Sequence, residues 1–431
     1  MMATAVQQLL PRLLVGVGDR AMVHLDEHLG AHGPLPDLLA RAPDQLIELV
    51  EVAGVRGHGG ASFPAGKKMR AVASRPGPAI VVANGSEGEP ASKKDRVLMR
   101  ELPHLVLDGA AVAARAVGSS DAVIAVAADD ERSLRSLESA LHQRRQARLH
   151  DDPRFELFMV APRYLSGQES ALVNAINGGP GIPTFTPPRP FERGVDRRPT
   201  LVQNVETLAH IALIVRHGAD WFREVGTSRD PGSVLVTLSG AVTAPGVYEI
   251  VHGMPLTELL DIAGLDDELT AVLVGGYFGT WLPTATVPGV RLAGDSLAEH
   301  GATLGAGVIV ALGVAACPVA ESSRIADFFA DEGAGQCGPC VHGLDAIAHS
   351  IHGLATGTAS RHAHSDLERW LAELPRRGAC QHPDGAAKFI SSSLRTFAAD
   401  FADHARHGPC DRCRSQVLPT PAVAAQPGRQ R

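Results

Sequence analysis

The chain has 431 residues, of which 45% are hydrophobic and 20% charged, and its formal net charge is −7 at pH 7. This length exceeds one ordinary hydrophobic core and predicts two or three domains of a globular protein. The negative charge and the 4% aromatic content argue against nucleic acid as the main partner. No basic segment precedes the apolar N-terminal residues, so we expect no signal peptide and a cytoplasmic protein.

One uncharged stretch, residues 301–320, is long enough to cross a bilayer. Four glycines and a proline interrupt it, and only residues 308–312 form a continuous apolar run. A run of that length is typical of a buried strand. We therefore expect no direct membrane span.

The first half of the chain alternates helix and strand patterns. Residues 1–43 are expected to form a poorly defined arm, and a helix should begin at Asp44 and end before Gly54. Buried strands are predicted over residues 79–83, 122–128 and 155–160, with helices between them. This order indicates an α/β domain, residues 44–230, with a parallel sheet and right-handed crossovers.

A glycine-rich stretch, RGHGGASFPAGKK, occupies residues 56–68. Glycines let successive backbone amides approach a ligand, and the flanking cations favour an anion such as phosphate. The stretch matches neither the dinucleotide fingerprint nor the Walker pattern. A flexible surface loop is the simpler alternative, which Phe63 and Pro64 disfavour.

Two polar loops follow predicted strands: NGSEGEP begins at Asn84, and YLSGQES begins at Tyr164. Polar groups just past the carboxyl ends of strands mark the ligand-binding edge of an open α/β sheet. We therefore expect these loops and the glycine-rich stretch to share one site.

The second half of the chain predicts two further domains and a tail. Residues 231–316 read as a hairpin, a helix and two more strands, which is the order of a small β-grasp domain; a continuation of the first sheet is the alternative. Residues 317–408 contain four helical patterns and predict a bundle. The Pro- and Ala-rich residues 409–431 are expected to be disordered.

Four motifs occur in a fixed order: RGHGGASFPAGKK, NGSEGEP, YLSGQESAL and PTLVQNVET. The series resembles the flavin-bearing, NADH-oxidising subunit of respiratory complex I and the related diaphorase subunits of hydrogenases and formate dehydrogenases. The resemblance covers roughly residues 46–401. It implies a Rossmann-like flavin domain, a ubiquitin-like β-grasp (SLBB) domain, and an iron–sulfur helical bundle.

The resemblance also implies an FMN site with an adjoining nicotinamide site. The residues that it assigns to them are Arg56, Gly57, Gly59, Gly60, Ala61, Phe63, Lys68, Asn84, Ser86, Glu87, Glu89, Tyr164, Gly167, Glu169 and Asn204. Ser86 and Gln203 replace a family Asp and a family Asn, but both keep hydrogen-bonding ability. FMN is therefore still expected, and a relative that has lost its cofactor is the alternative.

Three nucleotide contacts of the family are replaced. Ala71 and Arg189 stand at phenylalanine positions, and Thr186 stands at a lysine position. Aromatic stacking contributes about 0.5–1.5 kcal/mol per pair, so we expect weaker NADH binding. Arg189 could instead bind the 2′-phosphate of NADPH, or it is an ordinary loop cation.

Five of the six cysteines follow Gly335, which indicates metal chemistry rather than disulfides. The family's iron–sulfur motif has three cysteines at three-residue intervals and a fourth about forty residues on. Cys337, Cys340 and Cys380 match three positions, and Ala334 replaces the first. Three further side chains are given no metal role, as a core residue and two surface residues: Cys317, His362 and His364.

The fourth cluster ligand is left open by the motif. Cys410 and Cys413, after the last predicted helix, are expected to supply it for a three- or four-iron centre, best a [4Fe–4S] cluster. A rival interpretation pairs them with Cys337 and Cys340 in a zinc site. Free thiols are the last alternative.

The resemblance implies an oxidoreductase that takes a hydride from NADH or NADPH. Electrons would pass through FMN and the iron–sulfur cluster to a ferredoxin-like or other redox partner subunit. The alternative is an electron-transfer or assembly subunit that no longer oxidises a nicotinamide. The three replaced nucleotide contacts motivate that alternative.

Overall fold

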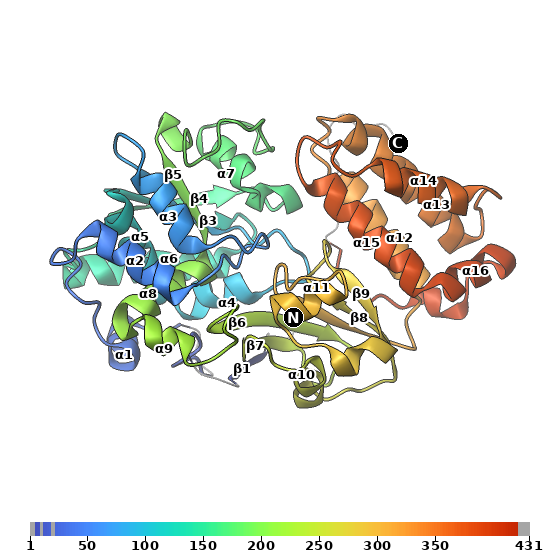
Figure 1. Ribbon diagram of the computed structural model, residues 1–431, viewed down its shortest axis with the longest axis horizontal. Coiled ribbons are helices and arrows are strands. Elements are labelled where there is room, and N and C mark those ends of the chain that lie inside the picture. The colour runs from blue at the N-terminus through green and yellow to red at the C-terminus, as the bar shows by residue number, and fades with distance from the viewer. Residues whose placement is uncertain (1–4, 9–11, 19–21, 421–431) are drawn as a thin grey trace.

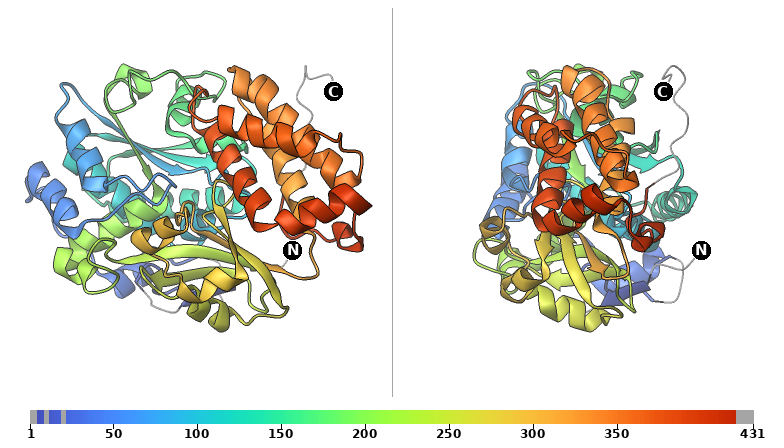
Figure 2. Two further views of the ribbon diagram at one scale, coloured as in Figure 1. Left: turned by 45° about the vertical axis from the view of Figure 1, so that its right-hand side comes forward. Right: turned by 90° about the vertical axis from the view of Figure 1, so that its right-hand side faces the viewer.

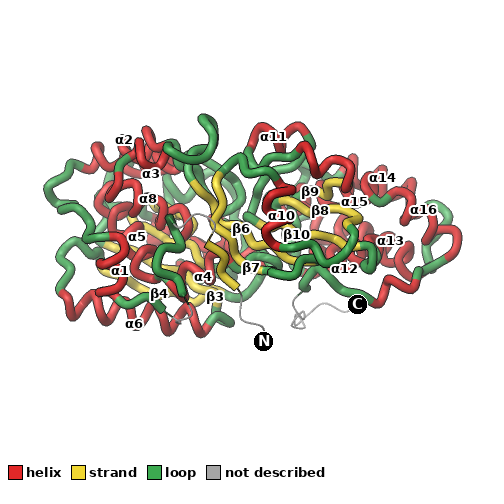
Figure 3. The backbone as a smooth tube through the Cα atoms, turned by 90° about the horizontal axis from the view of Figure 1, so that it is seen from below, coloured by secondary structure: helices red, strands yellow, loops and turns green. Residues whose placement is uncertain are grey.

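The computed structural model describes residues 5–8, 12–18 and 22–420 of the chain. Its elements form a parallel sheet covered by helices, then a mixed sheet, then a group of helices (Figure 1). From below, strands of the mixed sheet lie between the parallel sheet and the C-terminal helices (Figure 3).

The first sheet has four parallel strands in the order β4-β3-β2-β5. Their bounds are β2 Ile80–Gly85, β3 Asp121–Ala127, β4 Arg154–Val160 and β5 Thr200–Asn204. The predicted parallel sheet is confirmed. The prediction missed β5 and placed its last two residues, Gln203 and Asn204, in the following helix.

Helices pack on this sheet and on one another, and most of their apolar residues enter one large cluster. The most extensive packing between two helices is that of α5 Pro103–Val117 against α8 Val205–His217. The other helices of this part are α1 Leu25–His32, α2 Pro43–Ala53, α3 Ala65–Ala73, α4 Lys94–Glu101, α6 Glu131–Ala147, α7 Glu169–Ile176 and α9 Ala219–Arg223, with the short turns η1 Tyr164–Gly167 and η2 Val195–Arg197.

The mixed sheet has six strands in the order β1-β7-β6-β10-β8-β9. The predicted hairpin is the antiparallel pair β6–β7, and β10 runs parallel to β6 but antiparallel to β8. The elements are β1 Ala5–Gln8, β6 Ser233–Gly240, β7 Gly246–Val251, β8 Leu269–Val274, β9 Thr280–Pro283, β10 Val308–Gly313, α10 Leu256–Ala263, α11 Gly294–Glu299 and the turn η3 Thr284–Gly289.

Both faces of the mixed sheet are buried. Along β10, Val308, Val310 and Leu312 pack with the C-terminal helices, whereas Ile309 and Ala311 pack on the opposite face. Alternation of side chains along a strand makes this division possible. The views in Figure 2 show the C-terminal helices, orange to red, against this sheet.

The C-terminal part has five α-helices among the described residues, where four were predicted. They are α12 Pro318–Asp331, α13 Leu344–Thr356, α14 Ala363–Glu373, α15 His382–Thr396 and α16 Ala398–His407, with the π-type turn η4 Pro339–Gly343 and the 3-10 turn η5 Asp411–Arg414. The last predicted helix is divided at Phe397, whose dihedral angles are not helical and whose side chain is buried.

Two predictions about the chain ends need correction. Part of the expected N-terminal arm is ordered, because it contributes β1 to the mixed sheet and also forms α1. In the expected disordered tail, residues 409–420 are described and contain the turn η5, and Leu418 is fully buried although many of its neighbours are exposed. Residues 421–431 lie outside the described part.

The apolar segment 301–320 contains β10 and the start of α12, so it is not one long helix. No helix within the described ranges has the length and apolar character needed to span a membrane.

Candidate functional site

Two loops at the carboxyl edge of the parallel sheet touch directly. The Asn84 side chain, at the end of β2, donates from Nδ2 to the carbonyl oxygen of Gly167 at 2.8 Å. A Cβ on Gly88 would lie only 2.7 Å from the carbonyl oxygen of Tyr164. Glycine is therefore required where the loop after β2 meets η1, and both loops belong to one site.

The glycine-rich loop lies against the N-terminal end of α8. The Gly57 amide donates to the Phe63 carbonyl at 2.8 Å, and the His58 amide donates to Thr207 Oγ1 at 2.9 Å. Within the described chain, the exposed amides of the next three residues, 59–61, donate no hydrogen bond. Consecutive free amides in a loop that lies against the N-terminal end of a helix can bind a phosphate.

Charged and aromatic side chains surround this edge. Lys68 Nζ, on α3, lies 3.1 Å from Glu169 Oε2 at the start of α7. Arg56 Nε donates to Ser62 Oγ at 3.1 Å, and Phe63 is 54% exposed. The structure thus places Lys68 of α3 beside Glu169 of α7. This contact is expected if the glycine-rich stretch and the Tyr164 loop belong to one site.

Glu87 and Glu89 have different surroundings. The buried Glu87 carboxylate accepts from the backbone amides of Asp95 and Arg96 at 3.0 and 2.9 Å, so it caps α4. Glu89 Oε2 accepts from the Tyr277 amide at 2.9 Å and lies 3.5 Å from the Tyr164 hydroxyl. Burial raises the pKa of Glu89 to about 7, although the Tyr277 hydrogen bond opposes this shift.

Sequence analysis missed a buried ion network below the glycine-rich loop. Lys94 Nζ lies 2.7 Å from Asp95 Oδ1 and 2.8 Å from Glu206 Oε2, and Asn204 Nδ2 donates to Asp95 at 2.6 Å. Although burial alone would lower the pKa of Lys94, the two carboxylates raise it. The signal was available, because Asn204 and Glu206 lie within the motif PTLVQNVET, and Lys94 and Asp95 follow NGSEGEP by four and five residues.

His58, Glu206 and His210 present ligand atoms within 4.8 Å of one another. Glu206 is nevertheless occupied, since it accepts from the Leu235 amide at 2.8 Å and pairs with Lys94. Burial lowers the pKa of both histidines well below the ordinary value. These contacts indicate a structural polar cluster rather than a metal centre.

The nucleotide positions that depart from the family are accessible. Thr186 and Arg189 are exposed, and the Arg189 amide donates to Glu192 at 2.9 Å. Sequence analysis did not consider Phe185 beside them, which is 85% exposed. The exposure of this aromatic ring makes it a candidate nucleotide contact, and the sequence alone does not reveal that exposure.

Three cysteines that follow α12 lie close together. Cys340 is buried beside Cys337 and Cys380, and its thiol accepts a hydrogen bond from the Ala334 backbone amide. Burial and the neighbouring Cys337 raise the pKa of Cys340 to about 12. Thiolates that accept backbone N–H bonds are suited to an iron–sulfur cluster.

The tail cysteines do not join this group. Cys410 and Cys413 lie with Cys317 and His404, and their ligand atoms are all within 4.8 Å of one another. The prediction that the tail cysteines bind the same cluster as Cys337, Cys340 and Cys380 is therefore corrected. The alternative of a zinc site that combines the tail cysteines with Cys337 and Cys340 is corrected for the same reason. Cys317 is buried as expected, but it is part of a ligand group. The loop histidines at positions 362 and 364 are exposed.

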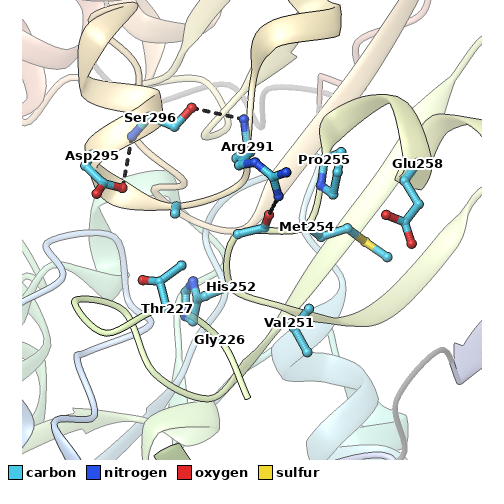
Figure 4. A pocket seen from close by; sticks show the side chains of 12 residues that line it. Gly226, Thr227, Val251, His252, Met254, Pro255, Glu258, Arg291, Asp295 and Ser296 are labelled. Carbon is cyan, nitrogen blue, oxygen red and sulfur yellow. Dashed lines mark hydrogen bonds between the residues drawn. The ribbon is translucent and has the colours of Figure 1, made fainter. Parts of the chain in front are cut away.

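A cavity of about 480 Å³ lies beside the mixed sheet (Figure 4). Its polar lining is largely paired, since Arg291 donates to the Gly253 carbonyl at 2.9 Å and to Ser296 through its backbone. None of the residues assigned to the flavin site lines it. The cavity therefore contributes nothing to the candidate site at the sheet edge.

Comparison with known proteins identifies two regions. The Nuo51 FMN-binding domain model matches residues 50–213, and the NADH-ubiquinone oxidoreductase-F iron-sulfur binding region matches residues 320–404. The structure also resembles a chain of an NAD+-reducing [NiFe]-hydrogenase in the H2-reduced state, with a TM-score of 0.84 and 31% identity. That match covers 94% of this chain and 68% of the hydrogenase chain.

Related sequences cover nearly all of the chain. The F 2 subunit of the NADH-quinone oxidoreductase of Rhizobium meliloti (strain 1021) is 32% identical over 92% of this chain and 97% of its own length. The mitochondrial NADH dehydrogenase [ubiquinone] flavoprotein 1 of Dictyostelium discoideum is 30% identical, over 85% of this chain and 80% of its own. The chain therefore belongs to the family of NADH-quinone oxidoreductase F subunits.

Proposed function

We propose that this chain oxidises NADH at an FMN site on the edge of its parallel sheet and passes electrons through a [4Fe–4S] cluster to a partner. One observation carries the proposal: three loops carrying the family motifs meet at the carboxyl edge of one sheet. The matched family models and relatives support the same activity. They give no support to an assembly subunit that has lost nicotinamide oxidation.

The FMN phosphate is assigned to the backbone amides of Gly59, Gly60 and Ala61, with Arg56 as the nearby cation. These amides have no partner within the described chain, and a buried Gln203 Nε2 at the end of β5 also has none. The buried Gln203 donor calls for an acceptor, and the amides of the exposed loop can exchange water for phosphate oxygens. When bound, FMN supplies the exchange between two-electron and one-electron transfer.

Other residues orient the cofactor or the loops around it. Asn84 holds η1 through Gly167, and Ser86 donates to Asn84 Oδ1 at 2.7 Å. Asn204 caps α8 and binds Asp95, and Gly57 closes the glycine-rich loop. We assign Glu87 a positioning role, because both of its oxygens accept from α4.

The nicotinamide is assigned to the side lined by Phe63, Glu89 and Glu169. The exposed Phe63 ring can stack on a base, and Lys68 places a cation beside Glu169. The Tyr164 hydroxyl lies beside the Glu89 carboxylate on this side of the site. Arg189 remains a proposed contact for the 2′-phosphate of NADPH.

The cluster is assigned to Cys337, Cys340 and Cys380 as three of its ligands. The iron-sulfur region of the family model includes all three. Electrons would leave toward a ferredoxin-like or other redox partner, since the relatives are subunits of larger enzymes. We further propose that the parallel-sheet part is a Rossmann-like domain, residues 44–230, that residues 231–316 form a β-grasp domain, and that residues 317–408 form the iron–sulfur domain.

The test is a diaphorase assay on the anaerobically purified full chain, followed by chromatography of the flavin released on denaturation. We expect yellow protein, FMN rather than the adenine dinucleotide, and NADH-dependent reduction of an artificial acceptor. Colourless protein that cannot be reconstituted with FMN would overturn the proposal.

A further inference from the structure

We propose that Cys317, His404, Cys410 and Cys413 form a structural zinc site that is separate from the iron–sulfur cysteines. All four ligand atoms lie within 4.8 Å of one another, and the cysteines are free thiols. Cys317 and His404 are buried, at 0% and 2% exposure, and the two tail cysteines are partly buried.

The distances match the edges of one coordination tetrahedron. Cys410 Sγ lies 3.8 Å from Cys413 Sγ, and His404 Nε2 lies 3.5 Å from Cys317 Sγ and 3.9 Å from Cys413 Sγ. With Zn–S of about 2.3 Å and Zn–N of about 2.0–2.1 Å, a tetrahedral site has S···S edges of roughly 3.8 Å and S···N edges of roughly 3.5 Å. A four-iron cluster binds each thiolate through a different iron, so it needs a wider group.

The zinc ligands and the iron–sulfur ligands lie at opposite ends of α12. Cys317 is the N-cap of this helix, whereas a Cβ on Gly333, just beyond its C-terminus, would lie 3.6 Å from Cys340 Sγ. A helix of 14 residues is about 21 Å long. The two groups therefore cannot share a metal. The family's iron-sulfur model also ends at residue 404, before the tail cysteines.

The fold holds the tail in place for this site. Arg412, between the two tail cysteines, donates to Asp400 Oδ1 at 2.7 Å and to the Ala316 carbonyl at 3.4 Å. The buried Glu321 of α12 accepts from the amides of Val417 and Leu418 at 2.8 and 3.0 Å. The ligands are thus presented by α12, by α16 and by an anchored segment, rather than by a loose terminus.

A cation also lies beside the ligand group. Three thiolates, a neutral imidazole and Zn²⁺ leave one negative charge. Arg412 interacts with Cys410 as well as with Asp400, so a guanidinium lies beside the ligand group. Because four protein ligands fill the tetrahedron, no open position remains for catalysis. The ion would instead fasten residues 409–420 and α16 to the start of α12.

The first test is metal analysis of the full chain, purified anaerobically without chelators. We expect one zinc per chain in addition to iron. Cys413→Ser should lose zinc and keep iron and flavin, whereas the matched variant Cys337→Ser should lose iron and keep zinc. Absence of zinc from the wild type, retention of zinc in Cys413→Ser, or loss of iron from that variant would each overturn the proposal.

A second measurement needs no variant. Zinc-edge X-ray absorption of the wild-type protein should show three sulfur neighbours at about 2.3 Å and one nitrogen at about 2.0–2.1 Å. A shell of oxygen atoms would identify adventitious surface zinc and contradict the site. A disulfide between Cys410 and Cys413, found by mass spectrometry of the anaerobic protein, would contradict it as well. Neither outcome depends on the proposed NADH oxidation.

Discussion

The two candidate functional regions of this chain use different chemical groups. At the sheet edge, the proposed FMN site consists mainly of backbone amides and of glycines that allow loops to touch. In the helical part, the proposed metal sites consist of a few thiols and an imidazole at the two ends of α12. The difference teaches which substitutions each region tolerates. Ser86 and Gln203 keep hydrogen-bonding ability at the proposed FMN site, whereas Ala334 offers no thiolate to the proposed cluster.

The largest expected effect is the loss of a thiolate. Cys340→Ser should remove the cluster, because Cys340 is buried and a hydroxyl is a poor ligand for iron. Iron content and the paramagnetic resonance signal of the reduced protein should both be lost while FMN remains bound. Cys413→Ser is the control and should keep the signal. Equal loss in both variants would mean that the two cysteine groups form a single site.

The next effect concerns Glu89, where burial raises the pKa to about 7. The folded state then holds a proton that the unfolded state releases near pH 4.5, so this contribution to stability is present below pH 4.5 and lost as pH rises through 7. The shift corresponds to roughly 3 kcal/mol. In denaturant titrations, the unfolding free energy of the wild type should therefore fall from pH 5 to pH 8 more steeply than that of Glu89→Gln.

Glu131→Gln is the control for this pH dependence, because the Glu131 side chain is 77% exposed. Its slope should follow the wild type. Parallel slopes for wild type and Glu89→Gln would show that the buried carboxylate does not hold the extra proton.

A smaller effect tests the backbone cradle. Gly60 has a φ of +105° and Gly77, in the turn before β2, has a φ of +90°, and a Cβ at either position would meet nothing within 4 Å. Alanine should strain both backbones similarly, by about 1 kcal/mol or more, and lower both melting temperatures. Only Gly60→Ala should also weaken FMN binding, by roughly tenfold in fluorescence titrations. Equal FMN affinity in the two variants would rule out the Gly60 amide as a contact.

The smallest effect concerns a side chain at the sheet edge. Lys68→Ala should weaken FMN binding and slow its reduction by NADH by roughly fivefold, or ~1 kcal/mol, because a partly buried cation is removed. Lys67→Ala changes an exposed lysine next to it and is the matched control. Stopped-flow kinetics of both variants makes the comparison. Similar rates for both would place Lys68 outside the flavin site.

Much of the sheet edge and the three cysteines at positions 337, 340 and 380 were predictable from the sequence, and the ligand group around Cys317 was not. Local apolar runs identified β2, β3 and β4, and four ordered motifs identified the loops. The strand β5 was missed because its five residues, TLVQN, include only two apolar side chains and so give no clear strand pattern before the helix. The group around Cys317 joins residues 87 positions apart, and no local spacing encodes that contact.

The most direct test of the proposed function is an anaerobic titration of the purified chain with NADH, followed by visible absorption and paramagnetic resonance. We predict that NADH bleaches the flavin absorption and produces the signal of a reduced iron–sulfur cluster. Gly60→Ala should retain less FMN and therefore show less bleaching, and Cys340→Ser should keep the bleaching and lose the signal. Wild-type protein that holds FMN and iron but shows neither change with NADH would contradict the proposed electron path.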